Sequence, residues 1–234
     1  MSILTSLGII FLAMLTHCFL QLSPSVFMIF YHYASGKYST KKADGLTIYY
    51  ILGEEIFLTA IFLFIYFIFF SIFIDIGSPA SSVLPWILSG IFFALSFISL
   101  FFYFRKGKNT ELFISRKLAK KITVNAKDVK TAFDAFVLGF TTCIPELIFI
   151  LPLFIAVALS LTYIINYPRS LLVFVYILVV VIPIFVYHHL YSTDHNLAEI
   201  ERHRIKNKSF YRLIISLGFF ILAFLLLNTG LGNG

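Results

Sequence analysis

The segment Phe136–Pro152, FVLGFTTCIPELIFILP, sets Pro145 and Glu146 inside a run that is otherwise apolar and long enough to cross a membrane. A proline in such a helix removes one amide donor and disturbs the carbonyl one turn back. Because the bilayer offers no water, protein or a water-filled cavity must satisfy the freed backbone groups. An acidic residue beside such a break marks a candidate functional site. The segment therefore predicts a membrane helix that is interrupted at a functional position.

The rest of the chain is also apolar enough to have the bilayer as its solvent. Apolar residues make up 60% of it and charged residues 12%, and its mean hydropathy is +0.95. These values lie far from the averages of soluble domains. A window of about 20 residues predicts six spans. They are Ile3–Tyr33, Leu46–Asp75, Val83–Phe104, Ala132–Ile165, Leu171–Leu190 and Leu213–Leu226. The first run lacks the basic start of a signal peptide, so we expect it to remain as a helix. These features predict an all-α, multi-pass protein of the cell membrane with a single transmembrane domain.

Basic residues predict the orientation of the spans. They cluster in Lys37–Lys42, Arg105–Lys130 and Arg202–Arg212, whereas the other connections hold only Arg169. The positive-inside rule places these three connections in the cytoplasm and both termini outside. The net charge of +7 is thus a topology signal. The sequence has no basic patch interleaved with aromatic residues, so we do not expect a nucleic-acid partner. The stretch Arg116–Lys130 is compatible with an amphipathic helix on anionic lipid or with a solvated linker.

The chain divides into two halves, residues 1–104 and 131–234, joined by the basic linker 105–130. Each half begins with a span that contains a proline in a polar setting, Pro24 in the first and Pro145 in the second. Three spans per half give the halves opposite orientations, which predicts a 3+3 inverted repeat with broken helices 1 and 4, as in many secondary transporters. The alternative is that both prolines are ordinary kinks, which membrane helices tolerate.

Several short motifs resemble those of the LysE superfamily of exporters. The first half carries three of them: Ser23-Pro24-Ser25, Ala34-Ser35-Gly36-Lys37 and Gly53-Glu54-Glu55. They are similar to the family's broken first helix, its basic turn of small residues and its glycine followed by an acid. The second half repeats the pattern of glycine, polar residue and proline with Gly139, Thr142 and Pro145. The resemblance covers most of the chain in layout and implies an exporter.

Two departures from that family bear on the substrate. Amino-acid-exporting members usually have Gly and Asn near the two prolines, whereas Ser25 and Glu146 follow them here. The resemblance therefore argues against an amino acid as cargo. The stretch Phe133–Phe136, which contains Asp134, is weakly similar to an aspartate-bearing helix of the manganese-efflux branch.

The membrane acids are the main candidate site residues. A carboxylate in hydrocarbon costs several kcal/mol, so it must face a cavity, bind a cation or hold a proton. Adjacent Glu54 and Glu55 point about 100° apart on a helix, so at most one aims squarely inward, and we favour Glu54 because it follows Gly53. Glu146 lies near the middle of its span, while Asp134 near the headgroups is explained by solvation.

Oxygen ligands of this kind suit hard divalent cations. Ser25, Thr141 and Thr142 have the hydroxyl groups to complete a shell around Glu54, Glu55 and Glu146, and a metal would be held by Glu146, Glu54 and Asp134. The same acids could instead carry the protons that drive antiport. In that case a different substrate occupies the cavity. A metal ion would be cargo, and we expect no resident cofactor.

The cysteines support an alternative function. Thiol-electron carriers of the CcdA/DsbD type, which are relatives of the superfamily, use one redox cysteine in each of the two broken helices, where Cys18 and Cys143 lie here. In that branch each cysteine adjoins the proline, whereas Cys18 precedes Pro24 by about 9 Å of helix, which makes a disulfide hard to form. Buried cysteines are mostly small apolar residues. Neighbouring His17 would touch a metal, relay protons or serve only the structure.

The sequence therefore predicts a secondary active transporter that exports a small solute or divalent cation, with ion or proton coupling. The alternatives are the thiol-electron carrier and a membrane scaffold that transports nothing. Nucleotide-binding glycine motifs, nucleophile elbows and paired zinc motifs are missing from the sequence, so we do not expect an enzyme. The expected partners are membrane lipid and the substrate. The sequence does not decide the oligomeric state, and a homo-oligomer is one of the alternatives.

Overall fold

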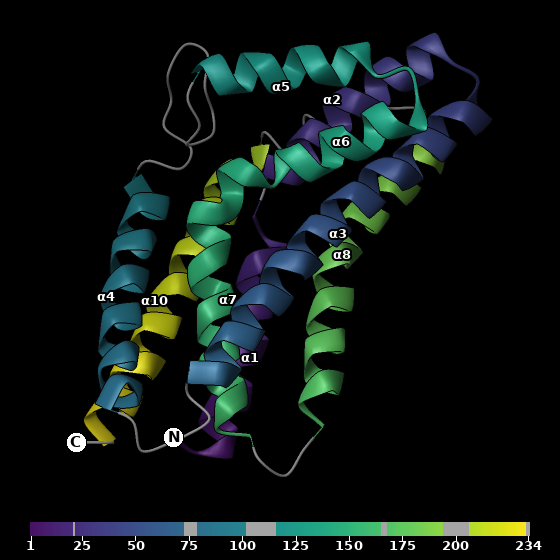
Figure 1. The fold of residues 1–234 in the computed structure, drawn as a ribbon. Helices are drawn as coiled ribbons and strands as arrows, with labels where there is room; N and C mark the ends of the chain where they lie inside the picture. Colours follow the sequence, from purple (N-terminus) through teal and green to yellow (C-terminus); the bar gives the residue numbers. More distant parts are fainter. Residues whose placement is uncertain (21, 73–78, 102–115, 165–167, 194–205, 233–234) are drawn as a thin grey trace.

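Helices make up nearly all of the chain that the computed structural model describes, namely residues 1–20, 22–72, 79–101, 116–164, 168–193 and 206–232 (Figure 1). Within these ranges the chain forms no strand, as the sequence predicts for an all-α protein. The helices in chain order are α1 (Ile3–Cys18), α2 (Leu22–Lys37), α3 (Thr40–Ile72), α4 (Pro79–Phe101), α5 (Arg116–Asp128), α6 (Ala132–Thr142), the 3-10 turn η1 (Ile144–Glu146), α7 (Leu147–Thr162), α8 (Arg169–Thr193) and α10 (Lys208–Gly232).

Five helical segments of the described chain are long and apolar enough to cross a membrane. They are Thr40–Ser71, Val83–Phe101, Ala132–Thr162, Arg169–Leu190 and Ser209–Leu231. These segments confirm a multi-pass membrane protein and correspond to the last five of the six predicted spans.

The first predicted span, Ile3–Tyr33, consists of two helices, and its break precedes Pro24, the predicted position, which lies in the first turn of α2. The chain leaves α1 after Cys18, where the amides of Phe19 and Leu20 turn back to the carbonyls of Thr16 and His17 at 3.2 and 3.0 Å. α2 then begins at Leu22. Each of these two helices has 16 residues and is about 24 Å long, which is less than the thickness of a bilayer core.

The fourth predicted span is interrupted at Pro145. α6 ends at Thr142, η1 contains Pro145, and α7 restarts at Leu147 with a different direction (Figure 1). The start of α6 is fixed by a capping box, in which the amide of Asp134 donates to Thr131 Oγ1 at 3.1 Å and the amide of Thr131 donates to Asp134 Oδ2 at 2.9 Å. This segment is thus two helices joined by one tight turn.

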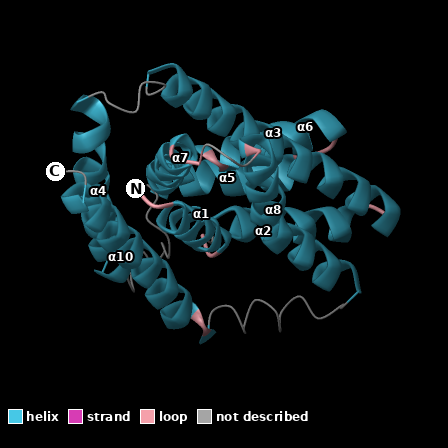
Figure 2. Cartoon of the chain, turned by 90° about the horizontal axis from the view of Figure 1, so that it is seen from below, coloured by secondary structure: helices cyan, strands magenta, loops and turns pink. Residues whose placement is uncertain are grey.

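Helices α4 and α10 form a closely packed pair at one side of the bundle (Figures 1 and 2). Their serines exchange hydrogen bonds across the contact: Ser96 Oγ donates to the Ser216 carbonyl at 2.8 Å, and Ser216 Oγ donates to the Ser96 carbonyl at 3.0 Å. Ser89 Oγ similarly donates to the Ala223 carbonyl at 2.8 Å. Small polar residues of this kind let membrane helices approach and hold them together. The pair reaches the rest of the bundle through α1 and α7.

Two glycines allow α3 and α6 to cross in backbone contact. A Cβ atom on Gly53 would overlap the Phe136 carbonyl, and one on Gly139 would overlap the Tyr50 carbonyl and approach the Glu54 amide to 3.1 Å. Any larger residue at either position would therefore push the helices apart. This contact fixes the position of Glu54 relative to the end of α6.

The buried apolar residues separate into two clusters along the length of the bundle. The first joins α1, α7, α4, α10, the later part of α3 and the early part of α8. The second joins α2, α5, α6, the early part of α3 and the later part of α8. Only α3 and α8 of the described helices contribute to both clusters. On α3 the change falls between Ile51 and Phe57, and on α8 between Tyr176 and Val181. The breaks after α1 and at η1 lie at this same boundary.

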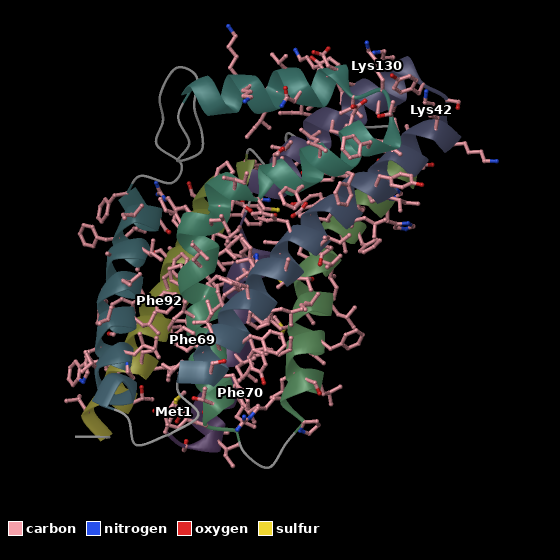
Figure 3. All side chains as sticks on the ribbon, viewed as in Figure 1. Met1, Lys42, Phe69, Phe70, Phe92 and Lys130 are labelled. Carbon is pink, nitrogen blue, oxygen red and sulfur yellow. The ribbon has the colours of Figure 1, made fainter. Side chains whose placement is uncertain are left out.

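The basic side chains that the structure describes around α5 lie at one end of the bundle. Lys42 and Lys130 are at the end that α5 crosses, whereas Met1 and the end of α10 are at the opposite end (Figures 1 and 3). α5 rests on α2 through buried Ile122 and Ala126, and Lys127 Nζ lies 4.7 Å from the centre of the Tyr33 ring. α5 is thus an amphipathic helix whose apolar side is covered by protein. Which end faces the cytoplasm stays a prediction of the charge pattern.

We expect Gly53→Ala and Gly139→Ala each to lower the free energy of unfolding by about 2 kcal/mol, because the added methyl group meets backbone rather than a side chain that can move aside. Thermal unfolding of the purified protein in detergent measures the effect. Gly45→Ala and Gly90→Ala are the matched controls, since nothing lies within 4 Å of a Cβ there, and they should leave stability unchanged or raise it slightly. Equal effects at all four positions would contradict the close crossing.

Candidate functional site

Glu54 and Glu146 lie on one small cavity at the boundary between the two apolar clusters. Glu54 comes from α3 and Glu146 from η1, and their side chains are 3% and 5% exposed. The cavity also involves residues of α1 and α8, and its lining consists of His17, Cys18, Leu20, Glu54, Leu58, Glu146, Val180, Pro183 and Ile184. We call this the diacid cavity. No lysine or arginine is among the described residues that line it.

The diacid cavity is the size of an ion or of one or two water molecules. The space open to the centre of a water molecule is about 20 Å³, and about 10 to 15 Å³ suffices for a single water. An amino acid does not fit this volume without a change of conformation. The structure thus brings together two of the predicted site residues, Glu54 and Glu146, around a space suited to a small ligand.

The break after α1 directs two further polar side chains to this level. His17 is buried, and its Nδ1 lies 3.1 Å from the Tyr176 hydroxyl on α8, with the imidazole edge-on to the Phe154 ring at 5.7 Å. The Cys18 thiol donates to the Val179 carbonyl at 3.5 Å. The sequence left the role of His17 open between a metal ligand, a proton relay and a structural histidine, and the structure places it on the diacid cavity with a buried hydrogen bond.

Thr142 joins α3 to α6 beside the diacid cavity rather than lining it. Its Oγ1 lies 3.3 Å from the Tyr50 hydroxyl and donates to the Gly139 carbonyl at 2.6 Å. Tyr50 is fully buried, stacks on Phe30 with ring centres 5.5 Å apart, and lies within electrostatic range of Glu54 and Glu146. Thr142 is therefore a positioning residue for the acids in this conformation.

The remaining predicted site residues do not join this group. Glu55 lines a different pocket, and the Thr141 hydroxyl donates to the Val137 carbonyl at 2.8 Å on its own helix. Asp134 is exposed and holds the start of α6, as its capping bonds show. The side chains of Pro24 and Ser25 lie outside the described residues.

A metal centre is not assembled in this conformation. Among the described residues no group of three or more His, Cys, Asp and Glu side chains is arranged to hold a metal ion. The predicted set of Glu146, Glu54 and Asp134 does not converge, because the Asp134 carboxylate is tied to backbone amides at the first turn of α6. The two glutamates and His17 around the diacid cavity are nevertheless ligand types that divalent cations use.

Both cysteines are free thiols in the structure. Cys18 is partly buried at the diacid cavity, and Cys143 is fully buried, with its thiol 3.6 Å from the Gly139 carbonyl that accepts its hydrogen bond. Neither cysteine precedes its proline directly. The redox alternative therefore stays a prediction to be tested by substitution.

Comparisons with known proteins give no relative for this chain: no family model, no curated protein and no solved structure matches it. The resemblance to the LysE superfamily accordingly rests on the short motifs of the sequence alone.

The capping role of Asp134 leads to a test that separates it from the cavity. Thr131→Ala should lower the free energy of unfolding by about 1 kcal/mol, because the first turn of α6 loses its cap. Asp134→Ala should destabilise in the same direction, and the double variant should fall short of the sum of the two, because both residues belong to one capping box. Thermal unfolding of the four proteins gives the cycle. If the two effects add fully, the capping box does not exist as described.

Proposed function

We propose that this chain is a secondary active transporter that moves a small cation, a divalent metal ion in the first instance, out of the cytoplasm. The observation that carries the proposal is the convergence of Glu54 and Glu146, one from each half of the chain, on one ion-sized cavity at the level of two helix interruptions. Acids at membrane depth cost free energy unless they serve a cation or a proton, so their joint placement favours a cation pathway.

The arrangement of the helices supports an inverted repeat of three plus three segments. In such a repeat α1 and α2 correspond to α6 and α7, α3 to α8, and α4 to α10. Under this correspondence the contact of α3 with α6 is the counterpart of the contact of α8 with α1, and the pairs α4–α10 and α3–α8 are their own counterparts. The contacts of α10 with α1 and of α4 with α7 have no counterpart of similar extent among the described helices, so the two halves differ in how they hold the α4–α10 pair. Transporters of this design place the binding site between broken helices near the midplane. The position of the diacid cavity beside the end of α1 and η1 supports this assignment.

The chemistry of the cavity favours a divalent cation as cargo. Two carboxylates offer hard oxygen ligands and compensate a double charge, while His17 and Cys18 offer softer donors. Mn²⁺ and Zn²⁺ are therefore the ions to try first. Export follows from the resemblance to the LysE exporters, and the location of both termini outside follows from the positive-inside rule applied to the basic end. Coupling to a proton or ion gradient follows from the same acids, which bind either a cation or protons.

Flux into reconstituted vesicles tests the proposal. Glu54→Gln and Glu146→Gln each keep side-chain volume and remove the charge, so each should reduce gradient-driven Mn²⁺ or Zn²⁺ flux at least tenfold. Asp134→Asn is the control carboxylate outside the cavity and should retain flux. Flux that survives in both glutamine variants, with equal amounts of folded protein, would overturn the role of the diacid cavity.

The thiol-electron carrier is the second candidate, because Cys18 lines the diacid cavity and Cys143 lies within electrostatic range of the same Tyr50. The double variant Cys18→Ser with Cys143→Ser separates the two functions. We expect it to keep metal flux within about threefold, since serine retains the size and hydrogen-bonding ability of cysteine. Loss of dithiol-dependent electron transfer across vesicles, with metal flux absent from the parent protein, would favour the carrier instead. A scaffold would show neither activity.

A further inference from the structure

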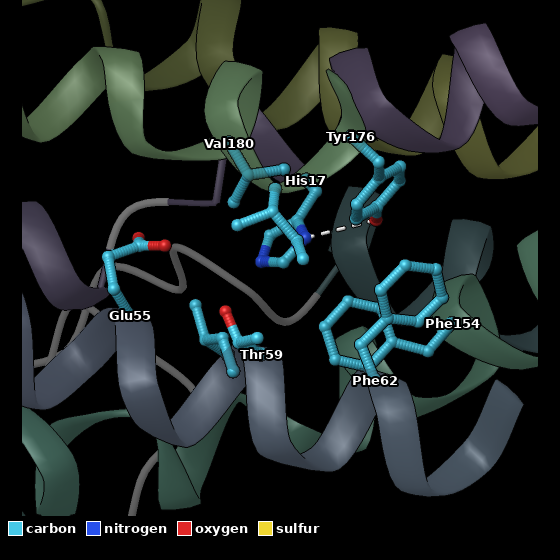
Figure 4. Close-up of a pocket in the computed structure, with 9 residues that line it drawn as sticks. His17, Glu55, Thr59, Phe62, Phe154, Tyr176 and Val180 are labelled. Atoms are coloured by element: carbon cyan, nitrogen blue, oxygen red, sulfur yellow. Dashed lines mark hydrogen bonds between the residues drawn. The ribbon is translucent and has the colours of Figure 1, made fainter. Parts of the chain in front are cut away.

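A second pocket shares His17 with the diacid cavity. It is enclosed by α1, α3, α7 and α8, and its lining is His17, Glu55, Leu58, Thr59, Phe62, Phe154, Tyr176, Ile177 and Val180 (Figure 4). The two pockets share His17, Leu58 and Val180, but Glu55 takes the place of Glu54 and Glu146. We call this the Glu55 pocket.

Three polar groups face the Glu55 pocket without a protein partner in the described part of the chain. Glu55 makes neither a hydrogen bond nor an ion pair with any described residue. The Thr59 hydroxyl is likewise unbonded among described residues, whereas Thr47 and Ser71 on the same helix donate to the carbonyls four residues back. His17 uses Nδ1 for the Tyr176 hydroxyl, and within the described chain nothing bonds its Nε2.

Figure 4 shows how these groups are directed. Glu55 and Thr59 are one helical turn apart on α3 and lie on the same side of the pocket, and His17 faces them from α1 with Nδ1 turned to Tyr176 and the other ring nitrogen turned away from it. When Nδ1 carries the proton and donates to Tyr176, Nε2 is an acceptor. A carboxylate, a hydroxyl oxygen and an imidazole nitrogen thus lie at the edge of the pocket as three acceptors, while most of its exposed lining is apolar.

The rest of the wall is aromatic. Phe62 packs against Phe154 with ring centres 4.8 Å apart and against Tyr176 at 5.2 Å. Aromatic faces attract cations when water is excluded. The space open to the centre of a water molecule is about 10 Å³, which is room for one occupant of that size.

From these groups we propose that the Glu55 pocket binds an ammonium ion. Ammonium is close to water in size and carries four N–H donors, which the three acceptors and one aromatic face can satisfy together. A hard metal ion takes six or more oxygen ligands, whereas this pocket offers few oxygens and an imidazole nitrogen. A cation beside Glu55 favours the charged form of its carboxylate, which then compensates the single charge of the ion. The binding of ammonium does not depend on whether the protein is a transporter. Its role as cargo or coupling ion rests on the proposed function.

Thermal unfolding of the purified full chain at pH 7 tests this binding directly. NH₄Cl, KCl and NaCl are compared at constant total salt, with choline chloride as the filler. A ligand that binds only the folded protein raises the unfolding temperature with saturation. We expect NH₄⁺ to do so while K⁺ and Na⁺ do not. Equal effects of K⁺ and NH₄⁺, or no effect of NH₄⁺, would overturn the proposal and leave a pocket filled by water.

Two substitutions place the ion in this pocket. Glu55→Gln and Thr59→Val should each weaken NH₄⁺ binding about tenfold or more, since the first removes the negative charge and the second removes a hydroxyl acceptor for a charged donor. Thr141→Val is the matched control, because its hydroxyl is satisfied by its own helix and lines neither pocket. Unchanged binding in both substituted proteins would contradict the assignment. Thr59→Val, which preserves side-chain shape, decides the matter if Glu55→Gln does not fold.

Two further comparisons identify the source of the ammonium group and separate this site from the diacid cavity. Methylammonium that binds as tightly as NH₄⁺ would assign the pocket to the head of an alkylamine, and weaker binding would assign it to free ammonium.

Glu54→Gln and Glu146→Gln should leave NH₄⁺ binding within about twofold of the parent protein even though metal flux is lost. If they abolish both, the two pockets form one site and the separate ammonium site is wrong. If no metal flux exists in any variant, NH₄⁺ binding still stands or falls by this assay.

Discussion

The fold depends on the requirement that every backbone polar group at membrane depth be satisfied within the protein. Both short helices that end inside the bundle, α1 and α6, end at the level where one apolar cluster gives way to the other. A helix end leaves amides and carbonyls open, and polar side chains gather where those groups are. Glu146 lies in the turn itself, and His17 in the last turn of α1. The polar level of the molecule is therefore a consequence of how its helices end.

Close packing then determines which acid faces which space. The contacts of Gly53 with the Phe136 carbonyl and of Gly139 with the Tyr50 carbonyl fix the rotation of α3 about its axis. With that rotation fixed, Glu54 faces the diacid cavity, and Glu55, about 100° further round the helix, faces the gap toward α1 and α8. The expectation that at most one of the pair aims inward holds for the diacid cavity, but it missed that the other acid has a pocket of its own.

The sequence alone predicted much of the membrane architecture and the central acids. Hydropathy located five spans because it depends only on local composition. The cost of a charge in hydrocarbon identified Glu54 and Glu146 as site residues, although the sequence does not show that they line the same cavity. The sequence pattern misplaced the break in Ile3–Tyr33, which was predicted at Pro24 and lies at Phe19 and Leu20, because neither hydropathy nor a proline shows where a helix changes direction. It also gave no signal for Thr59. A threonine on an apolar helix usually bonds its own backbone, and only the three-dimensional arrangement shows that Thr59 does not.

His17 lines both the diacid cavity and the Glu55 pocket. Its Nδ1 is bonded to the Tyr176 hydroxyl on α8, so the direction of Nε2 is fixed unless a buried hydrogen bond breaks. Both pockets also share Val180 on α8 and Leu58 on α3, the two helices that run through both apolar clusters. Any displacement of α8 along α3 that opens one pocket must therefore move a wall of the other. Occupants of the two pockets would then be coupled through this shared wall, since a ligand that stabilises one arrangement of α8 changes the affinity of the neighbouring pocket.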